Sequence, residues 1–440
     1  MRTLALTLLA LAFAGCGASE PEAGKPSRTV RLWIMNNGPD PVRDTERIVA
    51  PFERRTGIDV KVELVDWTDQ FDRIRTAART GEGPDLTQAG TTQVPYFAAL
   101  GGFEDLGPRV GTIGGASAYA PAVWDTTRVA GRDGTWAVPW FTEARAIYYR
   151  EDLLRAAGVE PGKAFATWSS FRRTLTKLRG LRAVDGTPVA PFGSPGAQAF
   201  DLVHHVAPFV WGAGGSELSA DGRHSTIASP KARAGVMYFA DLLRDGLYTP
   251  TTLDRDSGQV EAEFKRGRLA VWIGGPWTLA STRRDDDRDW SDQARRSVGI
   301  APLPEGPARR GYAFVGGSNL MMFKASRHKE EAWALIRFLS ESETQKQYAS
   351  LTGMFPARIG PQRQIGRRSA NHASFLRAIE QGRTYAALPQ WGQIENAYKT
   401  RFGKILEMAA GRSETPYNRD TVAAQLRAAA READALLAQG

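Results

Sequence analysis

The chain has 440 residues, which is enough for about two to three domains of average size. Hydrophobic residues make up 42% of the chain and charged residues 24%, a globular composition that excludes disorder throughout. The net charge is +9, but both signs are mixed along the chain, even in the charged segment 283–296, so we expect no nucleic-acid partner.

The N-terminus has the features of a bacterial secretion signal. A basic start precedes an apolar run over residues 4–14, which is too short to cross a bilayer. Ala14-Gly15-Cys16 follows and is similar to a lipobox, although Phe13 stands where Leu is usual. We therefore expect residues 1–15 to be a lipoprotein signal peptide. The alternative is a buried cysteine in an N-terminal helix.

Cys16 is the only cysteine, and we expect it to become the lipidated first residue of the mature protein. Its acyl chains would anchor the protein to the extracytoplasmic face of the cell membrane, at about 0.8 kcal/mol for each buried CH₂. The composition of residues 16–27 indicates a flexible tether. No later apolar stretch is long enough to be transmembrane.

The first part of the mature chain alternates strands and helices. Short apolar or alternating runs predict strands over residues 30–35, 60–64 and 86–89. Helices are predicted between them over residues 40–57 and 71–81, the first with an Asp-Pro start and a glycine end. This βαβαβ order predicts a parallel sheet covered by helices.

The later elements continue the α/β pattern, and the tail from Trp391 onward is expected to be mostly helical. In chain order we predict helices that begin at Thr167 and Ser229, strands over 269–273, 298–302 and 319–323, and a helix over 326–339.

The segment 134–158, GTWAVPWFTEARAIYYREDLLRAAG, combines a turn, a strand, an acid, a base and the start of a helix. It resembles the first crossing between lobes in extracellular solute-binding protein family 1, the sugar-binding proteins of bacterial ABC transporters. The matching residues are Ala137, Val138, Pro139, Glu143, Tyr149, Asp152, Leu153, Leu154 and Gly158.

Other motifs of that family follow in its order along nearly the whole mature chain. They are GFEDL at 102–106, FKRGRLA at 264–270, GPW at 275–277, VGIAPLP at 298–304 and GMFPAR at 353–358. Each motif alone is weak, but their common order and spacing make the resemblance specific.

The resemblance implies an α/β, two-lobe periplasmic-binding-protein-like fold with a hinge and an interlobe ligand cleft. The chain would cross between the lobes near Val138-Pro139, near Ala301 and near Ser340. The expected lobes are 28–138 plus 302–339 for the first, and 139–301 plus 340–440 for the second.

A sugar site needs planar polar side chains for paired hydroxyls and aromatic faces for C–H patches. Trp277 matches the sugar-stacking Trp of the family, with core packing as the alternative. Glu143 matches an acid that accepts bonds from sugar hydroxyls. Arg145 lies two residues further on the same strand face and either joins Glu143 toward the sugar or only pairs with it. Trp140 either stacks on the sugar or packs at the hinge.

Polar residues that follow the first and third strands are further candidates, since ligands of open α/β sheets bind at the strand ends. Asn36 and Asn37 follow the first strand, where a turn is the alternative; Gln88 and Thr92 follow the third. The maltose-binding relatives carry a Trp, an Asp and an Arg here, and this chain does not, so maltose itself is not indicated.

The remaining candidates come from later motifs. Gly317 could offer backbone N–H groups, Arg358 belongs to the PAR motif, and Trp391 lies near the last sugar-contacting stretch of the family. A turn and an exposed surface are the alternatives for Gly317 and Arg358. Gln390 and Glu395 lie near the same stretch as Trp391, and Asp201 and Trp211 flank another such stretch with weak registration.

The resemblance predicts a substrate-binding lipoprotein of an ABC importer. It would capture a mono- or oligosaccharide, most simply a disaccharide, between its lobes, and deliver it as a monomer to the transmembrane permease subunits. We expect no cofactor, no metal and no enzyme activity: glycosidases need two acids, and only Glu143 has a motif.

Two alternatives stay open. The ligand could be a polyol or a glycerol-phosphate-type molecule, for which Arg145 and Arg358 could supply the cations. The protein could also be a lipoprotein that acts by interaction and not by transport.

Overall fold

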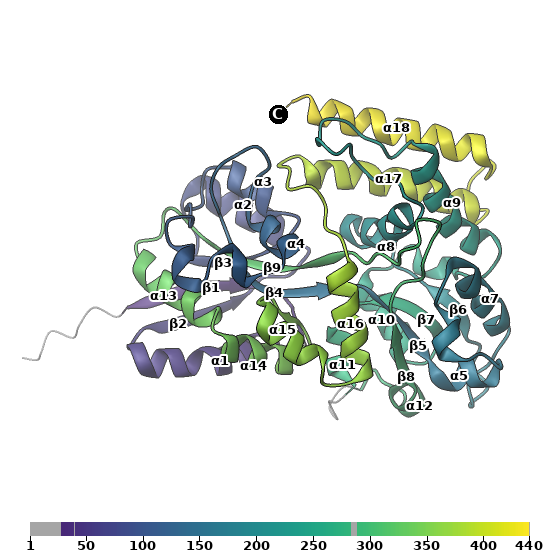
Figure 1. The fold of residues 1–440 in the computed structure, drawn as a ribbon, viewed down its shortest axis with the longest axis horizontal. Helices are drawn as coiled ribbons and strands as arrows, with labels where there is room; N and C mark the ends of the chain where they lie inside the picture. Colours follow the sequence, from purple (N-terminus) through teal and green to yellow (C-terminus); the bar gives the residue numbers. More distant parts are fainter. Residues whose placement is uncertain (1–27, 39, 283–287, 440) are drawn as a thin grey trace, which may run out of the picture.

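The computed structural model describes residues 28–38, 40–282 and 288–439. The predicted signal peptide, Cys16 and the tether lie outside the described residues. Two β-sheets form the centres of two lobes (Figure 1). The first sheet has six strands in the order β10-β4-β9-β3-β1-β2, and the second has four in the order β6-β7-β5-β8.

The strands of the first sheet come from the whole length of the chain. They are β1 (Thr29–Ile34), β2 (Asp59–Leu64), β3 (Leu86–Gly90), β4 (Val138–Ala144), β9 (Val315–Met322) and β10 (Phe355–Pro356). Those of the second sheet are β5 (Ala146–Arg150), β6 (Ala190–Gly193), β7 (Leu269–Gly274) and β8 (Val298–Ala301).

The predicted βαβαβ start is confirmed. β1 pairs in parallel with both β2 and β3, and the connections are the helices α1 (Pro41–Thr56) and α2 (Gln70–Thr80). Proline stands in the first turn of α1, and Gly57 ends the helix at φ 66°, a left-handed conformation that favours glycine. β9 then joins β3 to β4, antiparallel to both.

Helices cover both sheets. In the first lobe they are α3 (Val94–Ala99), α4 (Pro121–Trp124), α13 (Lys329–Leu339), α14 (Ser342–Thr352) and α15 (Ile359–Gly366), with α1 and α2. In the second they are α5 (Glu151–Ala156), α6 (Pro161–Ala164), α7 (Trp168–Leu178), α8 (Ala199–Gly212), α9 (Pro230–Arg244), α10 (Ser257–Lys265), α11 (Trp277–Ser281) and α12 (Asp292–Arg296).

Three further helices complete the chain: α16 (Ala370–Gln381), α17 (Trp391–Ala409) and α18 (Arg419–Leu437). α16 contacts β4 of the first sheet as well as β5 and β8 of the second. α17 and α18 lie together along the second lobe, where they pack on α8 and α9 (Figure 1). The C-terminal helices therefore belong to the second lobe, as expected.

Three segments cross side by side between the sheets, and backbone hydrogen bonds join them. Arg145 N–H donates to Phe314 O over 3.1 Å. Val315 N–H donates to Arg383 O over 2.8 Å, and Arg383 N–H donates to Ala313 O over 2.9 Å. Because these bonds link neighbouring crossings, the junction has the structure of a short sheet between the lobes.

The crossings differ in position from those predicted. Residues 139–144 pair with β9 in the first sheet, so the first crossing lies at Arg145 and not at Val138-Pro139. The second does not follow Ala301 directly, because the chain after β8 stays in the second lobe: Ala308 N–H, for example, donates to the carbonyl of Gly212.

The third crossing is also later than Ser340. α14 packs on α1, and β10 pairs with β4, so this part of the chain still belongs to the first lobe. The chain returns to the second lobe only through α16 and Arg383. The expected boundaries failed here because apolar helices and strands on either side of a crossing look alike in sequence.

Candidate ligand-binding site

An acid and a base lie at the first crossing, where β4 leaves its sheet. Glu143 ends β4 and Arg145 follows two residues later, with 6% and 5% of their surfaces exposed. Glu143 Oε1 lies 3.7 Å from Arg145 Nη2. Glu143 Oε2 and Arg145 Nε and Nη1 have no hydrogen-bond partner among the described residues. The ion pair is therefore buried, and both partners keep polar atoms that have no hydrogen bond within the described structure.

Trp277 covers the guanidinium of Arg145. The centre of its ring lies 4.7 Å from Arg145 Cζ, within the range of a cation–π contact. Trp277 Nε1–H donates to Glu261 Oε2 over 2.8 Å, which fixes the orientation of the indole. A Cβ at Gly275 would lie 1.8 Å from Trp277 Cζ3, so the glycine of the GPW motif is required by this close approach.

The second lobe adds polar side chains from α8. Asp201 is 1% exposed; its Oδ2 accepts the backbone N–H of Ser257 over 2.9 Å. Its other oxygen, Oδ1, has no partner within the described part of the chain. His204 lies one turn later, and its ring stacks on Phe314 at 3.6 Å and 15°. Phe314 itself comes from a crossing segment, so α8 faces the junction.

Four rings form a stacked cluster at the junction: His204, Phe314, Tyr385 and Trp391. Phe314 and Tyr385 stack at 5.2 Å, and Tyr385 and Trp391 at 4.2 Å. Because the faces of the rings cover one another, only their polar edges are left to form hydrogen bonds. Within the described ranges, Tyr385 Oη has no hydrogen-bond partner, while the indole of Trp391 bonds to Glu395 and lowers the pKa of that acid.

Glu395 lies one turn after Trp391 on α17 and is 7% exposed. Its Oε1 lies 3.3 Å from His204 Nε2, but without the alignment of a hydrogen bond. Side chains from α8, α17 and all three crossing segments thus meet around Arg145.

Burial sets the charges of these groups. It raises the pKa of Asp201 to about 6, against the effect of the Arg145 charge, and raises that of Glu395 to about 8. It also raises the pKa of Glu143, which Arg145 lowers in turn. Burial lowers the pKa of His204 well below its usual range, so this histidine is neutral at pH 7.

This arrangement can hold a ligand that is rich in hydrogen-bonding groups. Buried polar atoms of folded proteins nearly always have partners. Here polar atoms without a hydrogen-bond partner among the described residues gather at one junction, on Glu143, Arg145, Asp201, Tyr385 and Glu395. A ligand with several hydroxyl groups would complete their bonds.

The structure places two predicted residues in a different setting. Asn37 and Gln88 form a reciprocal amide pair, with bonds of 2.7 and 2.9 Å. Gln88 also accepts from the backbone N–H of Met35 and donates to Ser318, and Asn37 donates to Tyr348. Gln88 is fully buried. All of its hydrogen-bonding capacity is used inside the first lobe, so the expected contact with a ligand is corrected to a structural role.

Trp140 also packs in the first lobe. It is 1% exposed, and its ring lies 4.6 Å from that of Tyr348 and 5.4 Å from that of Phe141. A buried ring with both neighbours in the core has no face for a sugar. The packing alternative is the one that the structure supports.

The other candidates are scattered. Asn36 is exposed, and its carbonyl accepts from Trp67 Nε1–H; Thr92 is half-buried. Gly317 has φ 124°, and a Cβ there would lie 2.3 Å from Phe141 O, so it permits close strand pairing. Arg358 donates to Ile113 O over 2.6 Å within the first lobe, and no contact joins it to Arg145 in the described structure.

Sequence reasoning missed three of the junction residues. His204, Phe314 and Tyr385 carry no local motif, and only the neighbouring crossings bring them together. The resemblance places Glu395 near the last sugar-contacting stretch of the family, and Asp201 beside another stretch with weak registration. The motif residues Glu143, Arg145, Trp277 and Trp391 do meet at this junction.

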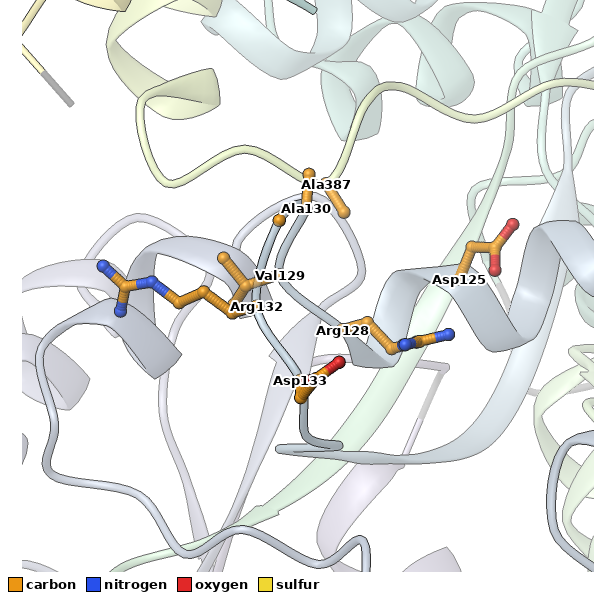
Figure 2. Close-up of a pocket in the computed structure, with 8 residues that line it drawn as sticks. Asp125, Arg128, Val129, Ala130, Arg132, Asp133 and Ala387 are labelled. Atoms are coloured by element: carbon orange, nitrogen blue, oxygen red, sulfur yellow. The ribbon is translucent and has the colours of Figure 1, made fainter. Parts of the chain in front are cut away.

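A separate hollow of about 490 Å³ lies at the surface between the loop 125–133 and Ala387 (Figure 2). There the backbone N–H of Ala130 donates to Ala387 O over 2.8 Å, which connects the loop of the first lobe to the segment that leads into α17. The lining side chains include Asp125, Arg128 and Arg132, all exposed. The hollow therefore marks an edge contact between lobes, away from the buried junction.

Other kinds of site were also considered. Among the residues that the structure describes, no group of three or more His, Cys, Asp or Glu side chains could hold a metal ion. In the same part of the chain, no helix combines the length and the apolar character needed to cross a membrane.

Two lobes with a polar and aromatic junction between them define a binding protein that encloses its ligand. The family profile described as bacterial extracellular solute-binding protein matches residues 38–346. The chain belongs to this family.

Curated relatives cover almost the whole chain. The diacetylchitobiose binding protein DasA of Streptomyces coelicolor is 25% identical over 400 residues, which are 88% of each chain. The maltodextrin-binding protein MdxE of Bacillus subtilis is 19% identical over 414 residues, 94% of this chain and 93% of the relative.

Solved structures share the fold. Maltose-bound MalE3 of T. maritima has a TM-score of 0.79 at 22% identity, with 93% of this chain and 99% of that chain covered. The solute-binding protein of Thermotoga lettingae bound with α-D-tagatose has a TM-score of 0.80 at 21% identity and covers 93% of this chain and 100% of its own. The predicted two-lobe α/β binding-protein fold is confirmed.

Proposed function

We propose that the protein is the substrate-binding lipoprotein of an ABC importer and that it captures a carbohydrate at the junction around Arg145. The observation that carries this proposal is the set of buried, unpartnered polar atoms that both lobes direct to one place. Charged groups make stronger hydrogen bonds than neutral ones, and Glu143 and Arg145 suit adjacent sugar hydroxyls. Relatives named for diacetylchitobiose and maltodextrin binding support the same ligand class.

A titration with carbohydrates tests the proposal. The purified protein is screened by thermal shift against mono- and disaccharides, polyols and glycerol phosphates. A ligand at about 100 times its Kd stabilises the folded state by about 2.7 kcal/mol. We expect a shift with a saccharide that Trp277→Ala and Glu143→Ala abolish and that Asn36→Ala, an exposed neighbour of the first strand, leaves unchanged. Shifts with no saccharide would contradict the proposal.

A phosphorylated polyol receives less support. Arg358, which was to be the second cation, is bonded to Ile113 in the first lobe, and the carboxyl groups of Glu143 and Asp201 would repel a phosphate near Arg145. A shift confined to glycerol phosphates would reverse this preference.

We propose further that the protein binds its ligand without chemical change, as its family membership supports. The test is mass spectrometry of a bound saccharide recovered after long incubation: an unchanged mass is expected, and a hydrolysed product would show an enzyme. Attachment through Cys16 is tested separately. Cys16→Ala should move the protein from the membrane fraction to the soluble extracytoplasmic fraction, whereas a buried structural cysteine would leave the distribution unchanged.

Delivery to the permease subunits completes the proposal. Closure of the lobes around the ligand would present both lobe surfaces together, and small-angle scattering should show compaction on binding. A protein that binds a saccharide without any compaction would argue against delivery by closure.

A further inference from the structure

We infer that the carbohydrate bears a positively charged amine, which lies between the carboxyl groups of Asp201 and Glu395. This inference rests on the proposed function, because it specifies the kind of carbohydrate that the same junction takes. It comes from the balance of charge among the buried groups and from the positions of their unpartnered oxygens.

Carboxyl groups outnumber cations at the junction. Three carboxyl side chains, Glu143, Asp201 and Glu395, have at most 7% of their surface exposed. The charge of Arg145 acts on Glu143, 3.7 Å away, and on Asp201, and His204 is neutral. The junction thus has more buried acid than base.

Two further cations near the junction already interact with acids. Lys265 lies 3.0 Å from Glu261, the residue that also accepts from Trp277. Arg383 packs over Trp211, whose indole donates to Glu217, and the charge of Arg383 lowers the pKa of that acid. Neither cation offsets the excess acid around Arg145.

The free oxygens show where the missing charge would lie. Glu143 shares its ion pair with Arg145, but Asp201 Oδ1 and Glu395 Oε1 have no hydrogen bond to any described residue. Both side chains come from the second lobe: His204, one turn after Asp201 on α8, has its Nε2 3.3 Å from Glu395 Oε1, and the charge of Asp201 also raises the pKa of Glu395. An ammonium group with several N–H donors can serve both oxygens at once.

Energetics favour a cation over a hydroxyl at this point. A buried carboxylate is costly unless it is paired, and a charge-assisted hydrogen bond is about twice as strong as a neutral one. Before a ligand binds, Glu395 keeps its proton, because burial raises its pKa to about 8. A hydroxyl would leave Asp201 without a counter-charge, whereas an ammonium pairs with Asp201 and takes the place of the proton on Glu395, so the site should prefer it.

A matched series of three disaccharides tests the inference. The β-1,4-linked glucosamine dimer, its N,N′-diacetylated form and cellobiose share one backbone and differ only at C2 of each sugar residue, which carries an amine, an amide or a hydroxyl. Titration calorimetry at about pH 6.5 keeps a sugar amine protonated. We expect the diamine to bind at least about tenfold more tightly than either neutral disaccharide, which corresponds to about 1.4 kcal/mol. Glucosamine and glucose form a second pair at monosaccharide size.

Substitution of the two acids should remove the preference. Asp201→Asn with Glu395→Gln should reduce the ratio of diamine to cellobiose affinity to near one, while cellobiose itself changes less. Glu414→Gln, on an exposed loop, is the matched control and should keep the ratio. If the double variant does not fold, the comparison of ligands on the unaltered protein still decides.

The outcomes separate the inference from the proposed function. Tighter binding of the amine member in either pair supports the inference. Equal or tighter binding of the neutral members, or no binding of any amine, overturns it, while binding of any saccharide preserves the proposed function. Only the failure of every saccharide would overturn both.

Discussion

Two buried polar clusters of this protein differ in one respect. In the pair Asn37–Gln88, every amide atom of Gln88 has a partner inside the first lobe. At the junction around Arg145, polar atoms of both lobes are equally buried but remain without partners in the described structure. Both clusters lie at or after strand ends, where sequence reasoning expects ligands.

The comparison shows that burial and polarity do not identify a binding site. A saturated cluster stabilises a lobe, because each of its hydrogen bonds is internal. An unsaturated cluster reduces stability until a ligand completes it. Substitutions in the first should therefore alter folding, and substitutions in the second should alter affinity.

The largest expected effect is on the saturated cluster. Gln88→Ala removes four hydrogen bonds and leaves the amide of Asn37 and the N–H of Met35 buried, so we expect a loss of about 3 kcal/mol in the free energy of unfolding. Urea denaturation measures this, with Asn36→Ala as the exposed control. A stable Gln88→Ala protein with weakened ligand binding would reverse the assignment of the two clusters.

The second prediction concerns the unsaturated cluster. Glu143→Gln keeps the size of the side chain but removes the charge beside Arg145, so ligand affinity should fall about tenfold, or about 1.4 kcal/mol, with little change in stability. Calorimetry measures the affinity; Glu46→Gln, exposed in the same lobe, should bind normally. Unchanged affinity would show that Glu143 only pairs with Arg145.

A third prediction extends the comparison to Arg358. Its bond to Ile113 O and its position 5.8 Å from the ring of Tyr119 are internal to the first lobe. Arg358→Ala should lower stability by about 1 kcal/mol and leave affinity unchanged. Arg363→Ala, exposed on the same helix, is the control. A specific loss of phosphate-bearing ligands would restore Arg358 to the binding site.

The smallest expected effect is on the pH dependence of the ligand-free protein. The pKa of Glu395 is raised to about 8, so between about pH 6.5 and 8 the folded state binds more protons than the unfolded state. Stability should fall as pH rises through this window, to which Glu217, with a pKa raised to about 7, also contributes. The histidines of α8 are neutral throughout it.

Glu395→Gln removes this titrating group, so the fall in the free energy of unfolding between about pH 6.5 and 8 should be smaller by about 1 kcal/mol. Denaturation at the two ends of this pH window measures the difference. Equal slopes in the two proteins would mean that Glu395 is ionised already at pH 6.5. A bound amine should have a similar flattening effect on the unaltered protein.

Much of the fold follows from local patterns. Proline and glycine bound α1, and alternation or apolar runs locate β1, β2 and β3, because these signals lie within one element. The crossings could not be located in this way. Residues 139–144 pair with β9, which lies nearly 180 residues later in the chain; Thr142, for example, pairs with Gly317. A local sequence pattern cannot reveal such a distant pairing.

The site residues also divide into those that a local motif reveals and those that only distant packing reveals. Glu143, Arg145 and Trp277 belong to motifs, and the structure brings them together. Trp140 and Trp277 look alike in sequence as aromatic residues near strand ends. Only the packing of Tyr348 from α14 against Trp140 distinguishes the core ring from the one at the junction.

The stacked cluster of rings has a consequence for observing the protein at work. Its rings come from α8 and α17 of the second lobe and from two crossing segments, so a rotation of one lobe against the other should disturb the packing of Phe314 and Tyr385, which the crossing segments carry. Trp391, at one end, is buried against Tyr385. Its emission should therefore change with every opening and closing, and the unlabelled protein carries its own optical reporter of ligand capture in real time.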